Sequence, residues 1–95
     1  METLKIKGKL ANPVKIIPED GGLLEIILEV KNENDESKFF FDYIEENNRL
    51  KNDYISIKAN TPIEVEYLKC FRSVGYHDQI NYNQIWSVKF LQKYK

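Results

Sequence analysis

The side chains that could carry out catalysis in this 95-residue sequence are few. The single histidine, His77, precedes Asp78 in a polar stretch with no candidate nucleophile assigned nearby. The single cysteine, Cys70, lies among apolar residues, as buried and unreactive thiols usually do. There is no glycine-rich phosphate loop, no Gly-x-Ser-x-Gly elbow and no His-Glu-x-x-His motif. The sequence therefore predicts a protein that is not an enzyme. Only a pocket that brings His77 and Cys70 together would indicate a small enzyme instead.

Metal and cofactor sites are also not expected. One histidine and one cysteine are too few for a typical zinc site, and a lone cysteine excludes an internal disulfide framework. The acidic pairs Asp35-Glu36 and Glu45-Glu46 fit a solvated surface better than a set of metal ligands. We therefore predict no cofactor and no metal.

The residues for a second chemistry, the binding of nucleic acid, are plentiful. Such a surface needs cations that follow the phosphates and flat side chains on which bases stack. The chain is 13% aromatic, with one tryptophan, six tyrosines and five phenylalanines. It also has 14 lysines and arginines, although 15 acidic residues bring the net charge to −1.

The basic residues are concentrated toward the two ends of the sequence. Residues 1–17 hold four lysines and one acid, and residues 67–95 hold five basic residues and one acid. Residues 18–53 hold eleven acids and four basic residues. A neutral total can therefore conceal a binding face.

The elements that must position these side chains are mostly strands. Apolar and polar residues alternate in residues 4–10, 23–31 and 63–71, and in a final stretch from 85 to about 91. Residues 37–44 are predicted to form a further strand, rich in aromatic residues and apolar on both faces, so that one face can be core and the other a contact surface. Gly8 marks a bulge or bend in the first strand, Asn12-Pro13 interrupts it, and a short continuation over 14–17 precedes Pro18. A short helix is predicted within 46–57, and residues 72–84 are predicted to form a polar loop.

This order, with a helix between the third and fourth of five strands, is the layout of the OB-fold, a small Greek-key barrel. The predicted class is therefore mainly all-β: one domain over residues 1–95, with a five-stranded OB barrel and one short helix. An SH3-like barrel, which lacks the helix, and an α+β sandwich of another topology are the alternatives.

The sequence also resembles the bacterial single-stranded-DNA-binding proteins and their primosomal PriB-like relatives. Residues 4–10 (LKIKGKL) resemble the first strand of that family, residues 54–66 resemble its helix end, tight turn and fourth strand, and residues 84–91 resemble its closing strand. Asn60 stands where the family pattern has glycine. The chain ends soon after the last predicted strand, without the acidic tip of the tailed members, and is in this respect closer to the PriB-like proteins.

The predicted binding residues come from the basic ends and from the aromatic set. Core packing is favoured for Phe39 and Phe41 and, less strongly, for Trp86, whereas Phe40 could serve either role. Tyr76 and Tyr82, in the predicted loop, are the better stacking candidates. The barrel is expected to gather the basic residues into one patch beside this loop. The candidate nucleic-acid-binding residues are Lys5, Lys7, Lys9, Phe40, Tyr43, Lys69, Arg72, Tyr76, Tyr82, Trp86 and Lys89.

The sequence thus predicts a single-stranded-DNA-binding protein of modest affinity that acts in DNA replication as an accessory to a polymerase, primase or helicase. The alternative is an OB-fold interaction subunit of such an enzyme, with little DNA affinity of its own. A homo-oligomer is compatible with either function. No signal peptide or membrane segment is evident, so a cytoplasmic location is expected. The lysine-, isoleucine- and asparagine-rich composition is typical of an AT-rich genome such as that of a mobile element or phage.

Overall fold

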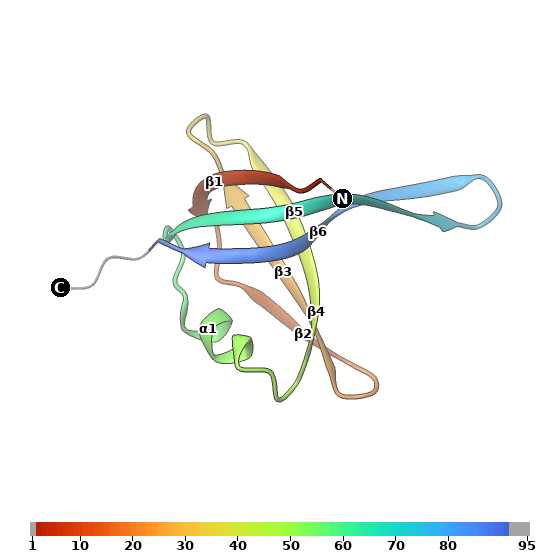
Figure 1. The fold of residues 1–95 in the computed structure, drawn as a ribbon, viewed down its shortest axis with the longest axis horizontal. Helices are drawn as coiled ribbons and strands as arrows, with labels where there is room; N and C mark the ends of the chain where they lie inside the picture. The colour runs from red at the N-terminus through yellow and green to blue at the C-terminus, as the bar shows by residue number, and fades with distance from the viewer. Residues whose placement is uncertain (1, 92–95) are drawn as a thin grey trace.

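The computed structural model describes residues 2–91, which fold into a six-stranded, strongly curved sheet with one helix (Figure 1). In chain order the elements are β1 (Leu4–Leu10), β2 (Lys15–Glu19), β3 (Leu23–Lys31), β4 (Ser37–Glu45), α1 (Leu50–Ser56), β5 (Pro62–Val74) and β6 (Asp78–Phe90). The helix in the described chain has seven residues, which is far too short to cross a membrane.

The sheet closes on itself as a barrel. Its strand order is β1-β5-β6-β4-β3-β2, and β1 also pairs with β3. All neighbouring strands are antiparallel except β4 and β6, which meet in parallel at Phe41 and Gln84. This arrangement, with the helix between β4 and β5, is that of the OB-fold, so the predicted fold class is confirmed.

The first strand of the barrel is long, bent and shared between its two halves, as the sequence suggested. Residues 4–9 pair with β5, while Lys9 and Leu10 pair with β3. After the break at Asn12-Pro13 the chain resumes as β2, which pairs with the first half of β3. The structure thus has six strand segments because the first strand of the barrel is divided into β1 and β2.

Gly8 lies where β1 crosses over to β3. A Cβ atom at this position would collide with the backbone carbonyl oxygen of Lys31 and lie 2.9 Å from Cγ1 of Val30. Only glycine therefore allows the two strands to approach closely enough to close this side of the barrel.

The core fills the barrel with alternate residues of each strand. From β3 and β4 it takes Leu24, Ile26, Leu28, Val30, Phe40 and Ile44, and from the other elements Leu10, Tyr54, Ile63, Val65, Tyr67 and Ile85. Tyr54 brings α1 against the barrel, where its ring packs edge-on against Phe90 at 6.0 Å. Burial raises the pKa of this phenol, and the charges of Asp42 and Asp53 raise it further.

The prediction that residues 72–84 form a loop is wrong. Strands β5 and β6 continue through it in unbroken register from Tyr67–Ile85 to Val74–Asp78, and they project from the barrel as a two-stranded arm (Figure 1). We call residues 69–83 the arm. Every residue from 71 to 80 is exposed, so this hairpin has no buried face and hence no apolar alternation to reveal it in the sequence.

The helix is shorter than the predicted range of 46–57. Residues 46–49 form its approach, and the Asn48 side chain accepts a hydrogen bond of 2.9 Å from the backbone N–H of Leu50. This contact forms a turn just before the helix, whose N-cap residue, Arg49, makes no capping hydrogen bond with its own side chain. The prediction placed the helix correctly in the order of elements but began it several residues early.

Candidate nucleic-acid interface

The outer face of β4 carries a row of aromatic side chains. Phe40 pairs with Leu28 and is completely buried, which places its neighbours Phe39 and Phe41 on the opposite face of the sheet. Phe39 and Tyr43 are 49% and 50% exposed, and Phe41 is half-buried. The expected core packing of Phe39 and Phe41 is therefore wrong, and Phe40, as a core residue, cannot stack on a base.

The strand pattern could not resolve this choice, because apolar side chains occupy both faces of β4. The decisive information is the register with β3, whose own alternation is clear: Leu24, Ile26 and Leu28 are buried, and the residues between them are half-buried. Pairing Leu28 with Phe40 then fixes the inward set.

The base of the arm lies against β4 where Gln84 pairs with Phe41, and two hollows flank this contact. One hollow, which we call the Lys69 hollow, is lined by Ser37, Lys38, Phe39, Phe41, Tyr67, Lys69, Asn81, Tyr82 and Asn83. The other, which we call the Glu25 hollow, is lined by Glu25, Phe41, Tyr43, Arg72, Ile80, Asn81, Tyr82 and Gln84. Phe41, Asn81 and Tyr82 line both. Because the two hollows share these three lining residues and both lie between β4 and the arm, we refer to them together as the groove.

Two side chains of β6 hold the base of the arm to β4. The amide of Asn83 donates a hydrogen bond of 3.0 Å to the backbone carbonyl of Phe39, and the amide of Gln84 donates one of 3.2 Å to the carboxylate of Asp42. Burial raises the pKa of Asp42, although the hydrogen bonds from Gln84 and from the backbone N–H of Tyr43 act in the opposite direction. These contacts fix the position of the groove's two walls.

Tyr43 and Glu25 are joined across β3 and β4. The Tyr43 hydroxyl donates a hydrogen bond of 3.1 Å to Glu25. This bond, together with the negative charge of Glu25, raises the pKa of the phenol, which therefore stays protonated and keeps donating. The groove thus contains a carboxylate held in place at its floor.

The basic candidates do not form one patch. Lys69 and Arg72 line the two hollows of the groove, whereas Lys5, Lys7, Lys9 and Lys89 lie on or beside the β1–β5 ladder. In that ladder Lys5 pairs with Glu66 and Lys7 with Glu64, and Lys89 of β6 pairs with Glu64 from the other side of β5. The predicted gathering of all six cations is therefore wrong, because Lys69 and Arg72 line hollows beside β4 while the other four lysines lie beside the acids of β5.

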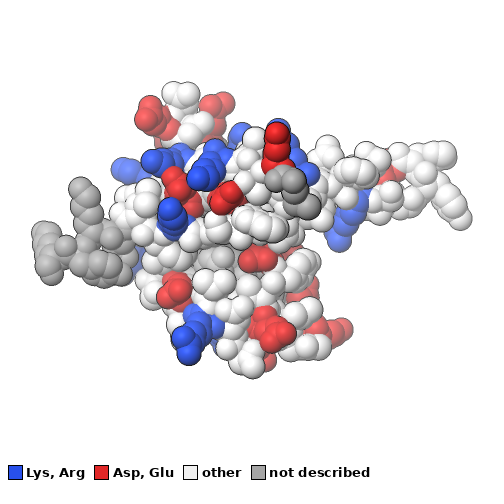
Figure 2. All heavy atoms as spheres, viewed as in Figure 1, with Lys and Arg blue, Asp and Glu red and all other residues white. Residues whose placement is uncertain are grey.

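The acids of β5 offset the ladder lysines. Nζ of Lys7 lies 3.7 Å from a carboxylate oxygen of Glu64. The pKa of Glu66 is lowered, first by a hydrogen bond from the Thr3 hydroxyl and then by Ser87, Lys5 and Lys89. Figure 2 shows the result: blue and red side chains alternate over β1 and its neighbours, while most of the arm is uncharged. Lys93 and Lys95, part of the basic C-terminal stretch, lie outside the described residues.

Trp86 is 62% exposed and lines neither hollow. The sequence placed it on one face with Val88 and Phe90, but a bulge in β6 opposite Glu66 and Tyr67 shifts the register there, so Ser87 pairs with Glu66 and Ile85 with Tyr67. Trp86 is the extra residue between them, and the expected core packing is wrong. A bulge has no reliable sequence signal, so the pattern alone could not reveal this.

Tyr82 and Tyr76 occupy very different places on the arm. Tyr82 is half-buried and lines both hollows, whereas Tyr76 is fully exposed in the turn at the tip. His77 shares that turn. Cys70 pairs with Tyr82, and the strand from Cys70 to Val74 spans about 13 Å. The arm therefore separates Cys70 from His77.

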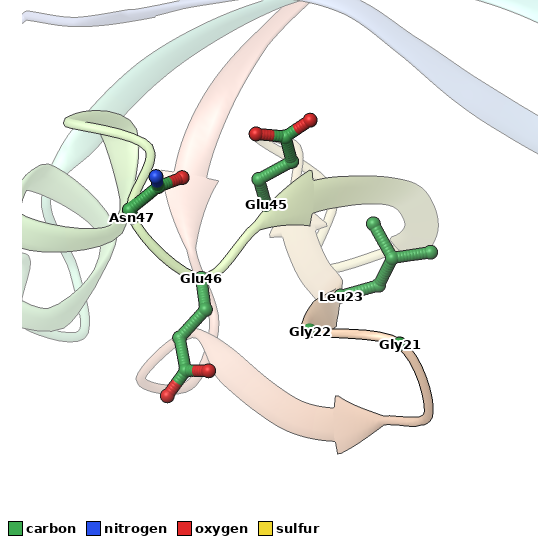
Figure 3. A pocket seen from close by; sticks show the side chains of 6 residues that line it. All are labelled: Gly21, Gly22, Leu23, Glu45, Glu46 and Asn47. Carbon is green, nitrogen blue, oxygen red and sulfur yellow. The ribbon is translucent and has the colours of Figure 1, made fainter.

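An acidic hollow lies between the β2–β3 turn and the end of β4 (Figure 3). It is lined by Gly21, Gly22, Leu23, Glu45, Glu46 and Asn47. The side chains of Glu45 and Glu46 point in opposite directions, so their carboxylates do not converge on one point (Figure 3). Within residues 2–91 there is no cluster of three or more histidine, cysteine or acidic side chains that could hold a metal ion.

Comparison with known proteins identifies the fold. No protein-family model matches the sequence, and no curated protein sequence matches it. Among solved structures, the N-terminal domain of PriB from Thermoanaerobacter tencongensis, described as dimeric, is 15% identical with a TM-score of 0.56, and the match covers 96% of this chain and 97% of that one. An OBody, NL8, bound to hen egg-white lysozyme is 13% identical with a TM-score of 0.59, and the match covers 99% of both chains. The similarity to the PriB-like proteins indicated by the sequence is thus confirmed at the level of the fold.

Proposed function

We propose that this protein binds single-stranded DNA in the groove between β4 and the arm. The observation that carries the proposal is the row of exposed aromatic side chains on β4, facing a wall that supplies Lys69, Arg72 and Tyr82. Stacking contributes about 1–3 kcal/mol per base and accepts any base, while the cations contact phosphates. The groove also lies where OB-folds bind oligonucleotides: on the second and third strands of the barrel, beside the loop that joins its last two strands.

The proposed setting is DNA replication, in which the protein would act as an accessory to a polymerase, primase or helicase of a mobile element or phage. The likeness of fold to a PriB domain supports this role. Because that domain is described as dimeric, we include a homodimer in the proposal; sedimentation of the purified protein would test it.

The binding test is a fluorescence-anisotropy titration of labelled oligo-dT at low salt. We expect a Kd in the micromolar range or below. Replacing both Phe39 and Tyr43 with alanine should weaken binding by about 2 kcal/mol or more, because two stacking surfaces are removed. A matched control is Leu50→Ala, which truncates an exposed apolar side chain on α1 outside the groove. Absence of binding at low salt would refute the proposal.

A protein-interaction subunit is the second candidate function, and the arm favours it. Phe71, Val74 and Ile80 are 63%, 41% and 44% exposed there, an unusual amount of apolar surface for a slender hairpin. The OBody neighbour, which is bound to lysozyme, is an example of this fold with a protein partner. This candidate would remain if oligonucleotides fail to bind.

A further inference from the structure

The Glu25 hollow differs chemically from the rest of the groove, because a carboxylate and a guanidinium both line it. Glu25 comes from β3 and Arg72 from the arm. Neither forms an ion pair with any residue of the described chain, so the two charges face the hollow without neutralising each other by direct contact. The remaining lining includes the rings of Phe41, Tyr43 and Tyr82.

A carboxylate in this place repels phosphate, so the backbone of a bound strand should pass elsewhere in the groove. The Lys69 hollow has no acidic lining residue and has two lysines, Lys38 and Lys69. It is the better place for phosphates. The Glu25 hollow is then left for a base, with the aromatic rings as the stacking surface.

The polar groups of the Glu25 hollow match one base better than the others. A carboxylate only accepts hydrogen bonds, and it has about four lone-pair sites. The Tyr43 hydroxyl uses one of these sites and fixes the carboxylate, which leaves the others for a ligand. Guanine presents two adjacent donors, N1–H and N2–H, on its Watson–Crick edge, and it presents acceptors at O6 and N7 that suit an arginine.

We propose that the Glu25 hollow is a guanine-preferring base site, in which Glu25 accepts from N1–H and N2–H and Arg72 donates to O6 or N7. Adenine and cytosine each offer one exocyclic amino group to the carboxylate. Thymine offers a single N–H between two carbonyl oxygens, which a carboxylate repels. This inference rests on the proposed binding of single strands and adds a base preference to it.

The test compares oligo-dT nonamers that carry one central dG, dA, dC or dT. For the unmodified protein we expect the dG oligonucleotide to bind about tenfold more tightly than oligo-dT, with dA and dC between them. Glu25→Gln should remove this preference and tighten the binding of oligo-dT, because the repulsive charge is lost. Glu29→Gln makes the same charge change on the same strand outside both hollows, and it should strengthen binding to all four evenly.

The outcomes separate the two proposals. Equal binding of all four oligonucleotides, or an unchanged preference for dG in Glu25→Gln, would overturn the guanine site and leave the proposed function intact. Absence of binding to every oligonucleotide would overturn both. Thermal unfolding of each variant would show that it is folded.

Discussion

At the scale of single residues, the groove depends on side chains whose neighbours have entirely different roles. Phe40 is a core residue, and Phe39 and Phe41 on either side of it face the groove. The sequence correctly indicated that both faces of this strand are apolar and that one could be a contact surface. It could not say which face, because three consecutive phenylalanines fit either register equally well.

On the arm, Tyr82 and Tyr76 test whether a bound strand contacts the tyrosine that lines the groove and not the one at the tip. Tyr82→Ala should weaken oligonucleotide binding by about 1–2 kcal/mol, because one stacking ring is lost from both hollows. Tyr76→Ala is the matched control, since this ring is fully exposed at the tip. Neither variant should lower the unfolding free energy by more than about 1 kcal/mol. A larger loss in the Tyr76 variant than in the Tyr82 variant would contradict the assigned position of the groove.

Asp42 should make the stability of the protein depend on pH. Its pKa in the folded state is raised by burial, so ionisation costs stability above that pKa, and the cost disappears as the pH falls toward the ordinary range of an aspartate. Asp42→Asn keeps an oxygen that can accept from Gln84 but carries no charge. We therefore expect the variant to have a higher Tm than the original protein at pH 7, with the difference vanishing near pH 3. An equal loss of Tm at both pH values would show that the carboxylate itself is required.

At the scale of elements, the barrel could be predicted from the sequence and the arm could not. Strands β1, β3 and the first half of β5 have one face toward the core, and this produces the alternation that located them, whereas β4 was located by its run of aromatic residues. Gly8 was predicted to mark a bulge or bend, and the structure shows there the close approach of β1 to Val30 and Lys31 of β3. Residues 71–80 of the arm are outside the barrel and all exposed, so their sequence is polar with scattered aromatics and has the pattern of a loop.

Shortening the arm should separate binding from folding. Replacing residues 72–80 with Asn-Gly would join Phe71 to Asn81, which already pair, by a two-residue turn that suits a hairpin. The variant loses Arg72 and Ile80 from the Glu25 hollow, and we expect its affinity for the nonamer with a central dG to fall by about tenfold while its Tm changes by only a few degrees. Circular dichroism and anisotropy would measure the two quantities. Full binding of that oligonucleotide by the shortened protein would show that residues 72–80 of the arm do not contribute to the site.

At the scale of the whole molecule, the distribution of charge sets a limit on affinity. The groove offers three cations, Lys38, Lys69 and Arg72, and the ladder lysines lie among acids on β5. The separation of charge along the sequence suggested a single basic patch. The fold instead divides the basic residues between the groove and the β1–β5 ladder. This division depends on the pairing of strands far apart in the sequence, which no local pattern specifies.

The salt dependence of binding should reflect this small number of cations. With at most three phosphate contacts on a single strand, and two where Arg72 contacts a base instead, a plot of log K against log salt concentration should have a slope no steeper than about −2. If the ladder residues Lys5, Lys7, Lys9 and Lys89 also contacted the strand, the slope would approach about −5. Measuring the binding constant at several concentrations between about 50 and about 300 mM NaCl would give this slope and distinguish the two cases.

The pairing of β1 with β5 also determines how the chain must fold. Leu4 lies opposite Tyr67, and the last strand must then pair with β5, as Phe90 does with Ile63. Bringing together strands that are so far apart in the sequence costs conformational entropy before the stabilising contacts between them can form. This barrel therefore belongs with the slow, non-local topologies that fold in milliseconds to seconds. During synthesis the hairpin of β2 and β3 can form early, but β1 has no β5 to pair with until more than sixty residues have emerged. Until then the backbone edge of β1 that pairs with β5 is free, and the lysines along that strand would discourage it from pairing with other chains.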